Sequence, residues 1–371
     1  MKKTVLSTLL VFIITISPLS PYQKNLLAED VITTLSLEEA INKGIENSTQ
    51  LTISELEIEV KKVELSEARH QEKKYQKAGV SIGTVDGFAL DANMLSKKAE
   101  YALEEEKLKQ EYLKENIKLN VMSAYYGALQ AEEYLHVTNS TLDNLQRNHD
   151  IIKKKFNLGM VSKSDLYMSE IALNEGEINV EKAKENVKKA FRALNMTLNS
   201  PLDTKLKLTS DFAQNDFQTN LNEDVEVAYT KRFDIIQLNN NYQLVKLDFE
   251  TNAIVYTPNT FIYKYKERNV AKMENLLHNA KLNIEFDIKG KYDEIESAKK
   301  QIALAKANVK KAKEGLRLRE LSYHAGTGTI LEVKEAITQL HNAQLAVSNA
   351  ITSYNLKILE YHKAVNLGTI S

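Results

Sequence analysis

The stretch that decides the fold lies near the C-terminus and reads Tyr323-His-Ala-Gly-Thr-Gly-Thr-Ile-Leu-Glu-Val-Lys-Glu-Ala336. Apolar residues recur at steps of three and four on both sides of it, from Ile288 to Leu316 and from Ala336 to Ala364. This spacing is typical of long helices that pack along a heptad seam. Gly326 and Gly328 permit the backbone angles that a chain reversal needs. The stretch is therefore predicted to be the tip of a helical hairpin.

The same pattern occurs earlier in the chain. An apolar seam from Ile117 to Ile152 leads into Phe156-Asn-Leu-Gly-Met-Val-Ser-Lys-Ser-Asp165, and another helical seam follows. A shift of 167 positions superimposes the two tips, which share an aromatic residue, a glycine and a hydroxyl residue at the same spacing. The matched pairs are Phe156 and Tyr323, Gly159 and Gly326, and Ser162 and Thr329. The chain is predicted to be a tandem duplication of one hairpin.

The composition agrees with long helices. The 371 residues include only 12 Gly and 4 Pro, with no Trp and no Cys, so helix breakers are rare. The formal net charge is -1, and without residues 1–28 the count is 46 basic against 50 acidic residues. This balance argues against a nucleic-acid partner. The lack of cysteine excludes disulfides.

The N-terminus has the pattern of an export signal. Met1-Lys-Lys3 precedes an apolar run from Val5 to Ile16 that is shorter than the ~20 residues of a membrane-spanning helix. A signal peptide over residues 1–28, cut after Ala28, is the favoured interpretation, and an uncleaved anchor is the alternative. The protein is therefore expected in the cell envelope.

The chain after the signal peptide is predicted to consist of a first repeat (residues 29–198), a linker (199–221) and a second repeat (222–371). The hairpin tips are expected at 156–165 and 323–332. Ser36, with Glu39 three residues later, predicts a capping box that starts a helix running to about Tyr75.

Another helix is predicted from about Ser96 to Lys155. The glycine-rich stretch 78–89 and the stretch 254–263, which contains Pro258, are predicted to be short, β-prone excursions from the helices.

The second tip resembles the signature of the TolC family of outer-membrane efflux ducts: an aromatic residue, two residues, Gly-Thr-x-Thr-Ile-x-x-Val, then Ala, Leu, Ala and Tyr at helical steps. The matching residues are Tyr323, Gly326, Thr327, Thr329, Ile330, Val333, Ala336, Leu340, Ala343, Ala350 and Tyr354, with Asn366-Leu-Gly368 at the end. Gly159 to Asp165 is similar to that family's first tip. Leu37 to Ala40 and Arg232 to Asp234 resemble its repeat openings.

The resemblance implies an all-α fold of long antiparallel coiled-coil hairpins, three chains of which form a hollow α-barrel. In the family a β-barrel is built from the mid-repeat excursions, but a membrane strand needs about 9–11 residues. The two excursions of this chain are too short for that. A reduced or missing β-barrel, with at most a vestigial β part, is therefore expected. The family location is the outer membrane and periplasm, or the cell wall region in an organism without an outer membrane.

The resemblance also assigns roles at the tips. The residues that would dock a periplasmic adaptor are Phe156, Gly159, Ser162, Tyr323, Gly326, Thr327 and Thr329. Asp165, Glu332 and Glu335 would form the entrance constriction, with Gly328 in place of an arginine that links to the aspartate in the family. The plainer interpretation is that these acids stabilise helix dipoles, by ~0.3–1 kcal/mol each. Both remain open.

The function implied is that of the exit duct in a tripartite efflux or type I secretion system. The duct would be a homotrimer that conducts passively and opens at its tips, with an adaptor and an inner-membrane ABC or proton-driven pump as partners. No cofactor is expected, and no catalytic or metal-binding motif supports an enzyme. The alternative is a structural or adhesive coiled-coil protein of the envelope without a channel.

Overall fold

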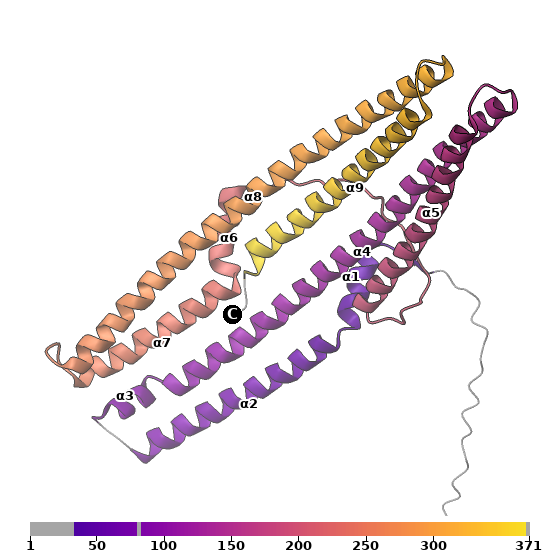
Figure 1. Cartoon of the computed structure of the whole chain (residues 1–371). Coiled ribbons are helices and arrows are strands. Elements are labelled where there is room, and N and C mark those ends of the chain that lie inside the picture. The colour runs from indigo at the N-terminus through magenta and orange to yellow at the C-terminus, as the bar shows by residue number, and fades with distance from the viewer. Residues whose placement is uncertain (1–32, 80–82, 369–371) are drawn as a thin grey trace, which may run out of the picture.

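The computed structural model describes residues 33–79 and 83–368, and it is a long, narrow bundle of helices (Figure 1). The helices are α1 (Leu37–Glu46), α2 (Thr49–Ala78), α3 (Val85–Asp91), α4 (Met94–Asn157), α5 (Lys163–Thr197), α6 (Leu221–Lys231), α7 (Phe233–Val255), α8 (Phe261–His324) and α9 (Ile330–Asn366). The predicted all-α fold of two long hairpins is confirmed. Helices α4 and α8 have 64 residues each, which corresponds to about 96 Å.

The helices form a row of four columns. In the half that carries the tips, α5 packs on α4, α4 on α9, and α9 on α8 (Figure 1). In the other half, α2 packs on α4, α4 on α7, and α7 on α8. Helix α8 therefore forms one edge of the row, and α2 and α5 form the other.

The predicted helix from Ser36 to about Tyr75 is interrupted. The capping box of Ser36 and Glu39 is present, but α1 ends at Glu46 and α2 restarts after Ser48, whose side chain accepts a hydrogen bond from the Leu51 N–H. The Asn47 side chain donates to the Leu198 carbonyl at 3.0 Å. The break is stabilised by this contact with the end of α5, 151 residues away in sequence.

The two excursions are not β-structure in the described residues. Gly79, at φ 60°, ends α2, and Thr84 caps the short helix α3. In the second repeat a turn of residues 256–260 joins α7 to α8, where Thr260 accepts a hydrogen bond from the Tyr263 N–H. Thr84 and Thr260 cap the helices that follow the two excursions. The prediction that the excursions are short is therefore confirmed, and the prediction that they are β-prone is wrong for the described residues.

Within residues 33–79 and 83–368, the only strands lie about halfway along the bundle, at mid-height. Strand β1 (Thr33–Leu35) pairs in parallel with β2 (Leu206–Leu208). The fully buried Tyr125 of α4 donates its hydroxyl hydrogen to the Leu35 carbonyl at 3.0 Å and accepts a hydrogen bond from the Ser210 N–H at 3.2 Å. This residue ties the start of the described chain and the inter-repeat segment to α4.

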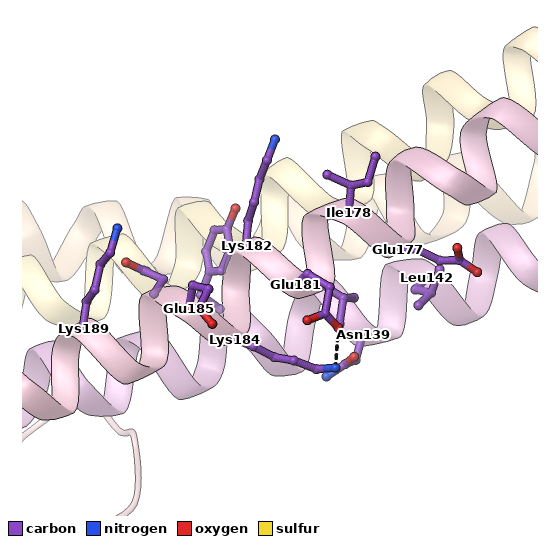
Figure 2. A pocket seen from close by; sticks show the side chains of 12 residues that line it. Asn139, Leu142, Glu177, Ile178, Glu181, Lys182, Lys184, Glu185 and Lys189 are labelled. Carbon is purple, nitrogen blue, oxygen red and sulfur yellow. Dashed lines mark hydrogen bonds and ion pairs between the residues drawn. The ribbon is translucent and has the colours of Figure 1, made fainter. Parts of the chain in front are cut away.

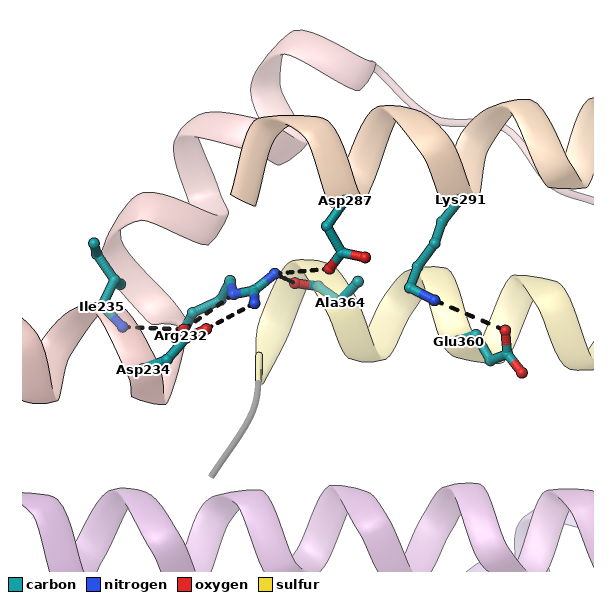
Figure 3. Close-up of polar contacts among 7 residues, drawn as sticks. All are labelled: Arg232, Asp234, Ile235, Asp287, Lys291, Glu360 and Ala364. Carbon is teal, nitrogen blue, oxygen red and sulfur yellow. Dashed lines mark hydrogen bonds and ion pairs between the residues drawn. The ribbon is translucent and has the colours of Figure 1, made fainter. Parts of the chain in front are cut away.

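A buried arginine holds the second repeat together at the same height (Figure 3). Arg232, only 5% exposed, lies in the extended break between α6 and α7. Its guanidinium donates to both oxygens of Asp234, to Asp287 on α8 at 3.1 Å and to the Ala364 carbonyl on α9 at 3.0 Å. A Cβ on Gly368 would lie 2.5 Å from an Asp234 oxygen, so this position requires glycine. The motifs Arg232–Asp234 and Asn366–Gly368 thus meet in space.

The expected signal peptide, residues 1–28, lies outside the described residues. Among the described helices, none combines the length and apolar character needed to cross a bilayer.

Candidate functional site

The two hairpin tips are built by the same backbone hydrogen bonds. At the first tip the Met160 N–H donates to the Lys155 carbonyl at 2.9 Å, and at the second the Thr327 N–H donates to the Ser322 carbonyl at 3.0 Å. Gly159 and Gly326 take φ values of 71° and 77°, which other residues rarely adopt. The 167-residue repeat is therefore present in the geometry of the turns as well as in the sequence.

The first turn of each returning helix is closed by a capping box. Ser162 and Asp165 cap α5, and Thr329 and Glu332 cap α9, with the acid accepting from the backbone N–H of the hydroxyl residue. Two of the three acids proposed for a constriction are thus cap residues. Both interpretations of these acids stand, since a cap carboxylate at a tip is also a surface charge.

The electrostatics of Glu332 follow from this cap. The hydrogen bond from the Thr329 N–H lowers the pKa of Glu332 below its ordinary value, and Arg319 lowers it further. The Arg319 guanidinium lies 3.2 Å from the carboxylate, and both side chains are exposed. Glu335 is exposed one turn further along α9. No hydrogen bond or ion pair within the described chain joins Asp165 to either glutamate.

The matched aromatic residues of the two tips have unequal surroundings. Phe156 is half-buried, whereas Tyr323 is 8% exposed and lies between the two hairpins. The Lys155 ammonium of α4 lies 4.2 Å from the centroid of the Tyr323 ring and donates to the Tyr323 carbonyl at 3.3 Å. Burial and the nearby charge of Asp165 raise the pKa of the Tyr323 hydroxyl, which has no hydrogen-bond partner. Lys155 and Tyr323 therefore form a latch between the tips.

The two hairpins also share an apolar core near the tips. Its buried members are Leu145, Ile152, Ala172, Leu316, Tyr323, Ile330, Val333, Ala336, Ile337 and Leu340. Beside it lies a groove of about 120 Å³ with apolar side chains from α4, α5 and α9, among them Met168, Ile171 and Leu331. Ile171 and Leu331 are more than half exposed, at 55% and 53%. Sequence reasoning missed this groove because its walls come from two hairpins.

Of the predicted docking residues, Gly159, Ser162, Gly326, Thr327 and Thr329 are exposed at the turns. Gly328 is half-buried, and a Cβ there would lie 3.1 Å from the Ser322 Cβ and from the Tyr323 nitrogen. A side chain at this position therefore requires a small shift of the turn.

A larger, open groove follows α4 and α5 away from the tips (Figure 2). It has a volume of about 1030 Å³, and charged side chains of α5 line much of it, with Lys184 donating to Glu181 at 2.7 Å. Among the described residues, acidic and histidine side chains form no group that could hold a metal ion. The histidine on the first seam, His149, instead shares a hydrogen bond with Ser169 at 3.0 Å.

Comparison with known proteins finds similarity to outer membrane efflux proteins. A family model described as outer membrane efflux protein matches residues 262–357, which cover α8 and most of α9. The outer membrane protein TolC of Salmonella enteritidis is 20% identical over 301 residues, which is 68% of this chain and 61% of that protein. The chain thus spans about three fifths of the length of that relative.

Solved structures share the fold. A membrane protein from Pseudomonas aeruginosa has a TM-score of 0.71 at 13% identity, covering 91% of both chains. The outer membrane protein VceC from Vibrio cholerae has a TM-score of 0.68 at 12% identity, covering 90% of this chain and 97% of that one. Together with the matched family model and the paired tips, these similarities make the chain similar to the TolC family of outer membrane efflux proteins, with the family model over residues 262–357 and the shared fold over nine tenths of the chain.

Proposed function

We propose that this chain is one subunit of a homotrimeric helical duct that conducts exported substrates passively through the cell envelope. The duct is the exit component of a tripartite efflux or type I secretion system. Similarity to a family of channels supports this function rather than an enzymatic one.

The observation that carries the proposal is a pair of exposed apolar stripes on the two edges of the row of helices. On the α8 edge the stripe consists of Leu276, Leu282, Phe286, Leu304, Leu318 and Leu321. On the opposite edge it consists of Ile53, Leu56, Val60 and Val63 on α2, and Tyr167, Ile171 and Ile178 on α5. Exposed apolar stripes at helical spacing favour contact with further helices.

The exposed apolar stripes of the two edges lie at similar heights along the long axis of the bundle. Phe286 is adjacent to Asp287, which contacts Arg232 at the mid-height break of the second repeat. The α2 stripe begins close to the mid-height break of the first repeat and runs in the same direction away from the tips. Leu318 and Leu321 lie in the last turns of α8 before its tip, and Tyr167 and Ile171 lie in the first turns of α5 after the other tip.

Two different edges that fit each other make a head-to-tail contact, which closes into a ring when the rotation per subunit allows. The row of columns would then continue around a central lumen. The number three rests on the family resemblance. A solid coiled coil, the alternative, needs only one apolar seam per helix and leaves these second stripes unexplained.

The gate lies at the tips in this proposal. Splaying of the two hairpins breaks the latch between Lys155 and Tyr323 and opens the mouth. The helical hairpin of a periplasmic adaptor contacts the tips and places apolar side chains in the groove beside Met168 and Leu331. The turn residues 158–162 and 325–329 border this docking surface.

The acids of the tips complete the gate. In the trimer Asp165, Glu332 and Glu335 would encircle the mouth, attract cations and repel anions. The adaptor connects the mouth to an inner-membrane ABC or proton-driven pump, which supplies the energy. The chain itself would need no cofactor.

The test uses disulfide cross-linking, because the chain has no cysteine of its own. Ile53→Cys on α2 and Phe286→Cys on α8, combined in one chain, are expected to join neighbouring subunits on mild oxidation, because the contacts of α2 with α4 place Ile53 near the height of Phe286. The covalent product should stop at three chains, and electron microscopy should show a hollow cylinder. The control pairs Ile53→Cys with Phe261→Cys, at the far end of α8, and should remain uncross-linked. Products that stop at two chains, or a solid rod, would contradict the duct.

A further inference from the structure

The turn between α7 and α8 lies at the end of the molecule opposite the tips (Figure 1). Large apolar side chains are exposed around this turn. Phe261 is 92% exposed, Tyr265 66% and Ile254 60%. Phe261 and Tyr265 are four residues apart and share one face of the first turns of α8. We refer to this turn with its flanking residues, 254–268, as the distal turn.

The distal turn is firmly held. The rings of Phe249 on α7 and Tyr263 on α8 pack edge to face, with centroids 5.1 Å apart. The Lys266 ammonium pairs with Asp248 at 2.5 Å, and Thr260 caps α8. The exposed side chains are therefore presented by a fixed backbone whose hydrogen bonds are satisfied, and their binding to a partner would require little ordering.

Cationic side chains surround this apolar patch. Lys264 and Arg268 are exposed beside it, and in the described chain neither has an ion-pair partner. Helix α3 packs on α7, so the region of the first repeat between α2 and α4 lies at the same end of the molecule. Lysines without ion pairs on the ends of α2 and α4 lie there: Lys73, Lys74, Lys77, Lys97 and Lys98. The exposed acids of this end, Asp86, Asp91, Glu100, Glu250 and Glu267, are fewer, and Glu100 is paired with Arg69.

We propose that the distal end binds the surface of an anionic lipid bilayer, with Phe261, Tyr265 and Ile254 inserted among the headgroups and the surrounding lysines and Arg268 against lipid phosphates. Aromatic side chains favour the interface between membrane and water. Basic residues close to an anionic leaflet are attracted to its negative surface potential. A second copy docked end to end is disfavoured, because two basic surfaces would repel each other. The proposal holds whether or not the chain forms a duct.

The test exploits the lack of tryptophan in the chain. Phe261→Trp in the full-length chain places a single tryptophan at the distal turn, which can be excited selectively in the presence of the tyrosines. The matched control at the other end is Met160→Trp, since Met160 is 68% exposed at the first tip. Vesicles of phosphatidylglycerol are expected to shift the Phe261→Trp emission to the blue, and pure phosphatidylcholine vesicles far less. The Met160→Trp emission should not move. An equal shift at both ends, or none at Phe261→Trp, would overturn the proposal.

Charge reversal separates lipid binding from other causes. Lys264→Glu with Arg268→Glu should weaken binding to phosphatidylglycerol vesicles on the order of tenfold or more, and added salt should weaken binding of the wild type. Binding that is unchanged by this pair would place the contact elsewhere, for example in the apolar N-terminal run. A blue shift that grows with protein concentration in the absence of vesicles would show a second copy to be the occupant.

Discussion

At the residue scale, the tips show how one motif takes two roles. Phe156 and Tyr323 occupy equivalent positions of the repeat, but only Tyr323 is buried between the hairpins, under the ammonium of Lys155. The equivalence of the two residues could be predicted from sequence spacing. Their difference could not, because Lys155 and Tyr323 are 168 residues apart and meet only when the hairpins pack.

Replacement of Lys155 by Met should loosen the latch. A cation over an aromatic ring contributes about 0.5–2 kcal/mol, so the population with separated tips should rise roughly threefold or more. Spin labels on Met160→Cys and Thr327→Cys, which are equivalent positions, would report a longer or broader distance distribution. Lys163→Met is the control, since Lys163 lies over Tyr167 of its own helix at 5.3 Å. An unchanged distribution for Lys155→Met would argue against the latch.

Replacement of Arg232 by Met should lower the free energy of unfolding by about 2–4 kcal/mol, because Asp234, Asp287 and the Ala364 carbonyl lose a buried donor. The control is Arg192→Met, whose pair with Asp203 has side chains 53% and 77% exposed. There the loss should stay below about 1 kcal/mol. Denaturant unfolding followed by circular dichroism would measure both. Equal losses of unfolding free energy in the two variants would mean that the buried ion pairs of Arg232 contribute no more than the exposed pair of Arg192.

At the element scale, the sequence predicts helices better than their interruptions. Gly159 and Gly326 are visible turn signals, and the predicted helix from Ser96 to Lys155 differs from α4 by only two residues at each end. The break at Asn47 contains neither glycine nor proline and depends on a hydrogen bond to Leu198. Likewise the start of α4 is capped by Glu72 of α2, which accepts from the Ser96 N–H at 2.9 Å. Contacts between distant segments carry no local sequence signal.

The cap of α9 should depend on pH. The pKa of Glu332 is lowered in the folded chain, so the stabilisation is complete above the ordinary value of 4.5 and is lost as the pH falls through the lowered pKa. At neutral pH, Glu332→Gln should therefore speed amide hydrogen exchange in the first turn of α9. This difference from the wild type should vanish at strongly acid pH.

Glu335→Gln is the matched control for that experiment, since Glu335 lies one turn further on and takes no part in the capping box. Its first-turn exchange should equal that of the wild type at every pH. Faster exchange in Glu335→Gln than in Glu332→Gln would show that general charge near the tip, rather than the cap, governs the first turn.

At the scale of the whole molecule, the heptad seams predict which helices form hairpins, but not which faces remain uncovered. The stripe of α8 includes Phe286, which is 81% exposed although its neighbour Asp287 contacts the Arg232 cluster. Buried and exposed apolar residues have the same helical spacing in the sequence. Only the packed row of helices distinguishes a seam from an edge, so the two edges were not predicted.

Two phenylalanines of α8 should separate assembly from lipid binding. Phe286→Ser is expected to shift the proposed trimer towards monomers by at least tenfold in dissociation constant, since about 1.5–3 kcal/mol of apolar burial is lost per contact. Phe261→Ser should leave the proposed trimer intact and weaken vesicle binding. Light scattering and vesicle co-sedimentation measure the two effects. A trimer that survives Phe286→Ser but dissociates in Phe261→Ser would exchange the roles assigned to the edge and the distal turn.

The equal length of α4 and α8 limits which insertions and deletions the chain can accept during evolution. The two helices start and end 167 residues apart, so both tips lie at one height and Lys155 reaches Tyr323. A heptad inserted into both helices of one hairpin would keep its own seam but raise its tip by about 10.5 Å above the other. Changes of length are thus tolerated only when both halves of the duplicated gene acquire them together, and the two repeats must lengthen or shorten as a pair.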